Sequence, residues 1–276
     1  MSLNKSKLTL AIAAAAGLTF SSGAFATNGI LQAGNGIAAH GLGGAGLSNA
    51  NEAMSGFDNP ALISQTGDSL SVGFSIFMPD RKVDTTGVTA LPAAFTGETT
   101  SDSKMFAIPQ IAFTSKVNDA LSWGILVNAL GGMNTDYRTG IAGDPSVPVT
   151  KAATDPQSVN LQGIIVAPTM SFAFDKNLSV GASLLLGYTT LTTRNLFGQG
   201  AAGTNEGSAT GYGVKLGTDW KISDSISFGA IIQPKMQMEE ISYFKTFLGG
   251  FGFTGDAALT LPNEIGIGGK FGAIVS

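Results

Sequence analysis

One short motif and a single histidine are the first residues to consider for chemistry. The segment from Gly41 to Gly46 satisfies the G-x-G-x-x-G pattern with which dinucleotide-binding proteins hold a pyrophosphate. That pattern functions after a strand, inside a βαβ unit, and no alternating segment precedes Gly41. His40 is the only histidine and there is no cysteine, so a zinc site or a Ser-His-Asp hydrolase would depend on this one side chain. We therefore predict no cofactor, no metal site and no enzymatic activity.

Cationic side chains in the second half of the chain are better candidates for ligand binding. Lys215 and Lys235 fall on the polar face of predicted strands, and Arg194 lies where a strand meets a long loop. Near the loop end, any of the three could form a charge-assisted hydrogen bond with a substrate carboxylate. The alternative is that they only contribute to the polar interior that a water-filled barrel has whatever it carries.

A group of phenylalanines occupies a long predicted loop, 241–256. Exposed aromatic side chains at this density usually mark a binding surface, and capture of a hydrophobic molecule is the use we expect. The alternative is that the rings pack onto the rim of the sheet. The candidate substrate-binding residues of this loop are Phe244, Phe247, Phe251 and Phe253.

The elements that position these residues are long segments in which apolar and polar side chains alternate. Such alternation is clear in 178–189 and in 225–239. The runs reach the ~9–11 residues that a tilted strand needs to cross a bilayer, against ~5–6 in an ordinary globular strand. The predicted strands are 68–78, 104–116, 121–133, 158–174, 178–193, 208–222, 225–240 and 257–271.

The connections between these strands alternate in length. Three are tight polar turns, and four are long loops rich in Gly, Thr, Asp and Pro, a pattern typical of outer-membrane barrels. Trp123 and Trp220 each lie beside a tight turn, where an interfacial aromatic girdle would be. Prolines within the predicted strands should mark bulges or bends, and the alternation continues around Pro234. These prolines are Pro109, Pro168, Pro234 and Pro262.

The first 26 residues have the three parts of a secretory signal peptide. Lys5 and Lys7 precede an apolar run too short for a membrane anchor, and small residues lead to predicted cleavage after Ala26. The whole chain is 43% hydrophobic and only 12% charged, whereas roughly a quarter of residues are charged in soluble domains. The acidic balance does not suggest a nucleic-acid partner. We predict an all-β, transmembrane antiparallel β-barrel.

Residues 27–67 lack this alternation and are rich in glycine and alanine, so they form a segment distinct from the barrel strands in 68–276. Within it, Asn59-Pro60-Ala61-Leu62-Ile63 follows the glycine-rich run 41–46, and together they resemble the FadL/TodX family of outer-membrane transporters for long-chain fatty acids and aromatic hydrocarbons. Later landmarks resemble the family in order: Ile108-Pro109, Asn118 to Gly124, Leu178 to Gly181, and Leu259 to Pro262.

This resemblance implies an N-terminal hatch, carrying Asn59, Pro60 and Ala61, that plugs a monomeric fourteen-stranded barrel in the outer membrane of a Gram-negative cell. It also implies a kink in the third strand, through which a hydrophobic molecule leaves the lumen sideways into lipid without an energy source. Gly131 and Gly132 are the best match to that kink, and glycines there would permit a bulge. The alternative is that they only begin a loop.

Eight strands are predicted here, and an eight-stranded barrel has no room for a plug of forty residues. We therefore expect the chain to be the N-terminal part of a longer protein and its strands to form an open curved sheet. The partners would be outer-membrane lipid and a hydrophobic small molecule. A structural or adhesive barrel without transport is the alternative function.

Overall fold

The computed structural model describes residues 32, 34–84, 86, 97–130, 132, 134–137, 157–194, 204–241 and 263–271. The long strands are β1 (Ser69–Phe77), β4 (Phe106–Lys116), β5 (Leu121–Leu130), β7 (Gln157–Ala173), β8 (Leu178–Arg194), β9 (Thr204–Ser223), β10 (Ile226–Gln233) and β12 (Glu264–Phe271). They confirm the eight predicted strands. Short strands within predicted loops or at a strand end are β2 (Lys82–Asp84), β3 (Glu98–Thr100), β6 (Asn134–Tyr137) and β11 (Gln237–Met238).

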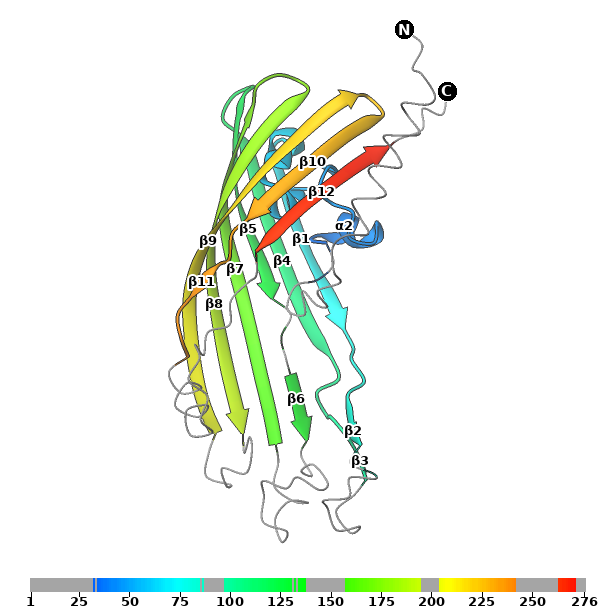
Figure 1. Ribbon diagram of the computed structural model, residues 1–276, viewed down its shortest axis with the longest axis vertical. Coiled ribbons are helices and arrows are strands. Elements are labelled where there is room, and N and C mark those ends of the chain that lie inside the picture. Colours follow the sequence, from blue (N-terminus) through cyan, green and yellow to red (C-terminus); the bar gives the residue numbers. More distant parts are fainter. Residues whose placement is uncertain are drawn as a thin grey trace.

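The long strands form one curved antiparallel sheet (Figure 1). Their order is β1-β4-β5-β7-β8-β9-β10-β12, so each strand lies beside its neighbour in the sequence. β6 extends the sheet beside β7, and β11 extends it beside β9. This up-and-down order confirms the predicted all-β fold as an open, partial barrel.

The two faces of the sheet differ in chemistry, because side chains of a strand point alternately to its two sides. On the outer face of β1, the side chains of Leu70, Val72 and Phe74 are 66–68% exposed. On the inner face of β7 and β8, the buried side chains near the tight turns are small and polar, such as Ser171 and Ser183, whereas farther along the strands Ile165 and Leu185 are buried and apolar. An apolar outer face and a polar inner face are the arrangement of a membrane barrel.

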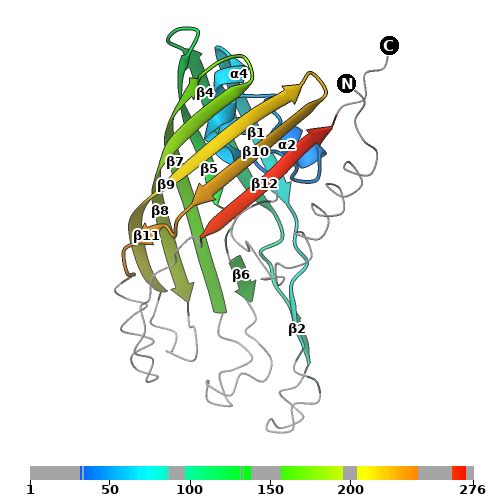
Figure 2. The ribbon, with the colours of Figure 1, turned by 45° about the horizontal axis from the view of Figure 1, so that its top comes forward.

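The N-terminal helices are short: α2 (Ile37–Gly41), α3 (Ser55–Asp58), η1 (Pro60–Leu62) and α4 (Ile63–Thr66). They lie on the concave side of the sheet (Figure 2), where η1 contacts β7, β8 and β9. None of the helices within the described residues has the length and hydropathy needed to span a bilayer.

The predicted tight turns are present, and side-chain hydrogen bonds hold two of them. Asn118 Oδ1 accepts from the backbone N–H groups of Ala120 and Leu121, at 2.9 and 2.8 Å. Asp175 Oδ1 accepts in the same way from residues 177 and 178. In each turn one short polar side chain thus accepts from two backbone N–H groups. These turns define the turn end of the sheet, and the opposite end is its loop end.

The sheet contains a one-residue bulge at Pro234, which corrects the predicted alternation there. Four residues, 233–236, face only three, 213–215, between the pairs Ile232–Leu216 and Gln237–Tyr212. A one-residue shift moves every following side chain to the other face. Met236 is therefore buried at 1% exposure while Lys235 is exposed, the reverse of the prediction.

Of the bulges or bends predicted at the other described prolines, there is no bulge, because the strands keep their register there. Pro109 pairs with Phe74 and Pro168 with Ile125, without a change of register on either side. Pro109 does mark a limit, because the β4–β5 ladder extends only as far as the next residue, Gln110. Pro262 lies outside the described residues.

Deleting Pro234 should remove the bulge and leave Met236 on the inner face, because the ladder then continues in one register. We expect the deletion variant to migrate as a folded band on unheated SDS gels at nearly the wild-type yield. Deleting Ile231, in the regular part of β10, is the matched control, since it turns the following residues to the wrong face. Equal loss of the folded band in both variants would contradict this account of the bulge.

Candidate functional site

The side chain of Asn59 joins the N-terminal segment (residues 34–67) to the sheet. It is fully buried. Its amide nitrogen donates to the carbonyl of Leu47 at 2.7 Å and to that of Thr218, in β9, at 2.9 Å. Its Oδ1 accepts from the backbone N–H of Ala61 at 3.1 Å and so caps η1, in which Pro60 takes the first position. The amide of Asn59 thus connects three parts of the structure: the backbone at Leu47, the start of η1 and strand β9.

Ala61 makes the next attachment. Its carbonyl accepts from the hydroxyls of Ser171 in β7 and Ser179 in β8, at 3.0 and 3.2 Å. Its side chain is fully buried, so a larger residue would press on the same strands. Asn59 and Ala61, on either side of Pro60, therefore bond to three adjacent strands.

Glycines on the inner face allow the backbones to approach this closely. A Cβ atom on Gly181 would lie 2.4 Å from the carbonyl carbon of Pro60, and one on Gly217 would lie 2.0 Å from Asn59 Oδ1. Gly181 and Gly217 are direct partners across β8 and β9. On β10, a Cβ at Gly229 would meet the Leu47 carbonyl at 1.9 Å. The sheet, which we call the wall, thus carries no side chains at these positions, where the segment packs, so the two backbones can come into contact.

A buried carboxylate of the wall, Asp219, is satisfied by donors from the same segment. Ser48 Oγ donates to Asp219 Oδ1 at 2.5 Å, and Gln65 Nε2 donates to Asp219 Oδ2 at 2.7 Å. Asp219 is 2% exposed. Removing the segment would return this carboxylate to water, so the polar inner face and the segment stabilise each other.

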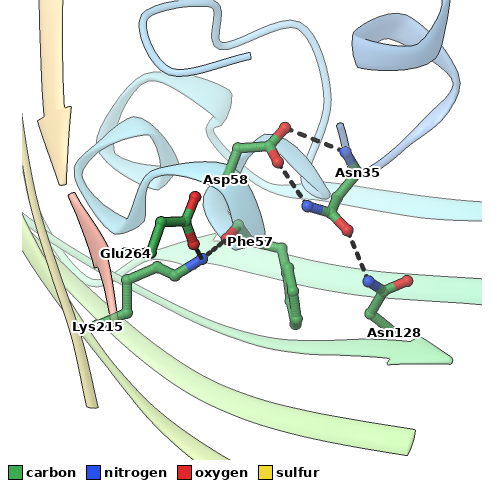
Figure 3. Close-up of polar contacts among 6 residues, drawn as sticks. All are labelled: Asn35, Phe57, Asp58, Asn128, Lys215 and Glu264. Carbon is green, nitrogen blue, oxygen red and sulfur yellow. Dashed lines mark hydrogen bonds and ion pairs between the residues drawn. The ribbon is translucent and has the colours of Figure 1, made fainter. Parts of the chain in front are cut away.

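Lys215 of β9 is the buried cation of the inner face (Figure 3). Its ammonium donates to the carbonyl of Phe57 at 3.0 Å, lies 3.9 Å from a carboxylate oxygen of Glu264 and sits 5.3 Å from the centre of the Phe57 ring. Its side chain is 7% exposed and that of Glu264 is 36% exposed. Lys215 is thus shielded from solvent, whereas Glu264 remains partly exposed.

A chain of amide contacts lies beside this lysine (Figure 3). Asp58 accepts from the backbone and side-chain nitrogens of Asn35, at 3.3 and 2.5 Å. Asn35 Oδ1 accepts from Asn128 of β5 at 2.6 Å. A cavity of about 290 Å³ adjoins Asn35, Asp58, Lys215 and Glu264. This cavity has both charge signs on its lining.

The carboxyl group of Asp58 is held in an unfavourable environment for a charge. Burial raises the pKa of Asp58 from 3.8 to about 6, although the hydrogen bonds from Asn35 and the ammonium of Lys215 oppose the rise. Glu264 adds a smaller effect in the raising direction. The proton affinity of Asp58 therefore depends on how the N-terminal segment is seated.

The wall itself is interrupted between β4 and β5. These strands pair from Lys116–Ser122 to Gln110–Asn128, and toward the loop end β4 pairs only with β1 in the described residues. Beyond Leu130 the register to β7 shifts by one residue, since Leu130 pairs with Gly163 but Asn134 pairs with Asn160. Gly132 is needed there, since its Cβ would lie 1.6 Å from the Leu161 carbonyl.

A cavity of about 270 Å³ occupies this interruption, which we call the wall opening. Its lining includes Ile108 and Leu161, which are buried on the inner face, and Ala107 and Gln162, which are exposed on the outer face. The cavity is therefore lined by residues of both faces of the sheet. Its remaining lining is largely apolar: Phe77, Met105, Phe106 and Leu130, with Gly132 and Asn134.

Comparison with protein families decides the identity of this fold. Residues 12–271 match the family described as outer membrane protein transport protein (OMPP1/FadL/TodX). The chain belongs to this OMPP1/FadL/TodX family. The family resemblance carried by the Asn59 motif is thereby confirmed, and the family is one of transport proteins and not of enzymes. No curated protein matches the chain.

Solved structures of OMPP1/FadL/TodX members share the fold. The toluene transporter TodX of P. putida has a TM-score of 0.58 at 16% identity, covering 85% of this chain and 62% of that one. The Ralstonia pickettii toluene transporter TbuX has a TM-score of 0.58 at 20% identity, covering 75% and 58%. A Pseudomonas aeruginosa FadL homologue has a TM-score of 0.51 at 15% identity, covering 84% and 62%. The chain thus spans less than two thirds of their lengths.

The candidate binding residues fall in different places. Lys215 faces inward as predicted, but it lies nearer the turn end than the loop end of β9, where it contacts Phe57 of the N-terminal segment. Arg194, the last residue of β8, is exposed and follows the alternate positions that point outward. It therefore does not face the lumen, which corrects the prediction. Lys235 is turned out by the bulge, and its backbone N–H donates to Asn263 Oδ1 at 2.6 Å. Outside the described residues lie Gly131, Phe244, Phe247, Phe251 and Phe253.

Replacing Asn59 with alanine should loosen the N-terminal segment, because two part-buried carbonyls, of Leu47 and Thr218, lose a donor. Each such loss costs about 1–3 kcal/mol. We expect faster hydrogen exchange or proteolysis within 34–67 while the sheet stays protected. Asn51→Ala, at an exposed position of the same segment, is the matched control. Unchanged exchange in Asn59→Ala would show that the three bonds do not hold the segment.

The seating of the segment should weaken as the pH rises from 4 to 7. When the segment is packed on the sheet, the pKa of Asp58 is raised, so Asp58 keeps its proton at pH values at which it would be ionised in a released segment. Proton binding therefore stabilises the packed state at low pH, and this stabilisation is lost as Asp58 ionises. The difference between 3.8 and about 6 corresponds to about 3 kcal/mol. Hydrogen exchange of residues 34–67 at pH 5 and pH 7.5 measures it. Asp58→Asn should remove the difference, and a pH dependence that persists in this variant would assign it elsewhere.

Proposed function

We propose that this chain forms part of a passive outer-membrane transporter for hydrophobic small molecules, such as long-chain fatty acids or aromatic hydrocarbons. The family supports the general role, because it consists of outer-membrane transport proteins. The names of the similar structures include two toluene transporters, which makes a hydrocarbon a reasonable substrate. We expect the protein to act as a monomer, after removal of a signal peptide near Ala26.

The wall opening carries the proposal. Many of its lining side chains are apolar, its lining comes from both faces of the sheet, and it lies between β4 and β5 at the loop end of their ladder. A hydrophobic molecule that entered from the loop end would meet the N-terminal segment below it and lipid beside it. Lateral exit through the opening would avoid breaking the many polar contacts of the segment. The substrate moves down its own gradient, so no energy source is required.

Within this proposal, Asn59, Pro60 and Ala61 are the residues that anchor the N-terminal segment as a hatch. Gly132 is the residue that we expect to permit the wall opening, because a Cβ there would meet the Leu161 carbonyl. Lys215 remains a candidate for a substrate carboxylate. Such a carboxylate would have to replace the contacts of Lys215 with Phe57 and Glu264. The phenylalanines of 241–256 remain candidates for capture at the loop end.

The other two roles have less support. A structural or adhesive barrel would be favoured by an N-terminal segment outside the sheet, but the described part of this segment packs on the inner face. A hydrolase would need His40 beside a serine and a carboxylate. Within the described residues, His40 Nε2 has no hydrogen-bond partner.

Gly132→Ala should impair uptake of a hydrophobic substrate, because the added Cβ collides with the Leu161 carbonyl and must shift the strand at the wall opening. We expect cells that depend on the full protein to accumulate labelled toluene or oleate at most about a tenth as fast, if the backbone shift costs 1.4 kcal/mol or more. Folding is checked by heat-modifiable migration on gels.

Gly73→Ala is the matched control, because its Cβ would make only ordinary contacts of 3.5 Å with Ile37. Uptake at the wild-type rate by folded Gly132→Ala would remove the wall opening from the transport path. Loss of uptake in both variants would point to a general effect of alanine in the wall.

A further inference from the structure

The loop side of the wall opening is closed by a set of polar contacts that we call the clasp. It consists of Arg81, the residues 101–103 that precede β4, and β6. On the turn side the opening is bounded by the ordinary Gln110–Asn128 ladder pair. On the loop side no ladder joins β4 to β5 or β6 in the described residues, so the clasp is the connection that spans the gap.

The contacts of the clasp reach β6 from two neighbouring segments. The guanidinium of Arg81 donates through Nη1 to the Asn134 carbonyl. The backbone N–H of Asp102 donates to the Asp136 carbonyl at 2.7 Å, and the backbone N–H of Asp136 donates to Ser101 Oγ at 3.0 Å. Ser103 Oγ donates to Asn134 Oδ1 at 3.1 Å. β6 in turn pairs with β7, so the clasp ties both sides of the opening together.

Arg81 connects the clasp to the lining of the opening. Its guanidinium carbon lies 5.8 Å from the centre of the Phe77 ring and 5.6 Å from that of Phe106. Both rings line the cavity. The Arg81 carbonyl also accepts from the Ser101 N–H at 2.9 Å, so this residue holds the segment 101–103 as well as β6. A planar, half-buried cation can stack on two rings and donate at the same time.

We infer that Arg81 positions the loop-side rim of the wall opening and thereby sets the largest molecule that can pass through it. The argument is geometric. The turn-side rim is fixed by a continuous ladder, whereas the loop-side rim depends on one cation and a few single hydrogen bonds. Loss of Arg81 would release both Asn134 and the two rings, and the opening would widen toward the loop end. The inference rests on the proposed lateral exit, and it adds a residue that selects substrates by size.

A thiol in the opening tests the inference without a transport assay. The chain has no cysteine, so Ile108→Cys places a single thiol in the cavity lining, at a position 8% exposed. Labelling rates are measured on the full protein in lipid vesicles with a small methanethiosulfonate and with a bulky fluorescein maleimide. Arg81→Ala should raise the ratio of bulky to small labelling about tenfold or more, as expected for loss of a charged hydrogen bond.

The ratio separates a wider opening from general loosening, because loosening raises both rates together. Lys82→Ala is the matched control, since Lys82 is the next residue and pairs only at the surface, 2.9 Å from Glu98. Arg81→Lys keeps the charge without the planar fork and should give an intermediate ratio. Ser103→Ala removes one contact from the other side of the clasp and should raise the ratio by a smaller factor, which covers the case in which Arg81→Ala fails to fold.

An unchanged ratio in both Arg81→Ala and Ser103→Ala would overturn the role of the clasp, as would an equal rise in Lys82→Ala. These results are independent of uptake. If Gly132→Ala abolishes uptake while the ratio is unchanged, the lateral path stands and the clasp does not set its size. If the ratio rises but Gly132→Ala transports normally, the clasp controls the opening and the proposed function fails.

Discussion

The strict alternation of side chains along a strand is the constraint on which this structure depends. Each residue of the sheet faces either the apolar exterior or the polar interior, and a shift of one position exchanges the two. The chain uses this property at defined places. Near Pro234 a single extra residue turns Met236 inward and Lys235 outward. Between β5 and β6 the register to β7 also shifts by one residue. The second shift coincides with the end of the β4–β5 ladder, and the wall is open there.

The polar interior imposes a second requirement, because buried polar groups need partners. The N-terminal segment supplies them with short side chains and backbone groups. Asp219 receives donors from Ser48 and Gln65, and Lys215 donates to the Phe57 carbonyl. The segment has little regular structure of its own, so its conformation is determined by the wall that it covers. The wall and the segment thus form one polar interface. Asp58 is buried in it away from water, and this burial raises the pKa of its carboxyl group.

The sequence was sufficient to predict the eight long strands, the tight turns and the inward orientation of Lys215, because period-2 alternation and turn residues are local signals. It failed where a single residue changes the register: alternation alone cannot reveal that Pro234 introduces a bulge while Pro168 does not. β6 and the clasp were missed for a related reason. Arg81 and Asn134 are far apart in the sequence, both lie in predicted loops, and their contact follows from the path of the chain in space. The Asn59 motif was found by resemblance, and its bonds explain why an amide is required there.

The two donors of Asn59 also bear on the order in which the protein assembles. One bond stays within the N-terminal segment, but the other reaches a carbonyl 159 residues later in the chain, in β9. The segment is synthesised first, yet its acceptor on the wall exists only after several strands have paired. Contacts of such long sequence separation form slowly, because much of the chain must be ordered before they contribute. The segment therefore cannot complete its contacts until β9 has paired, and its folding is coupled to assembly of the sheet.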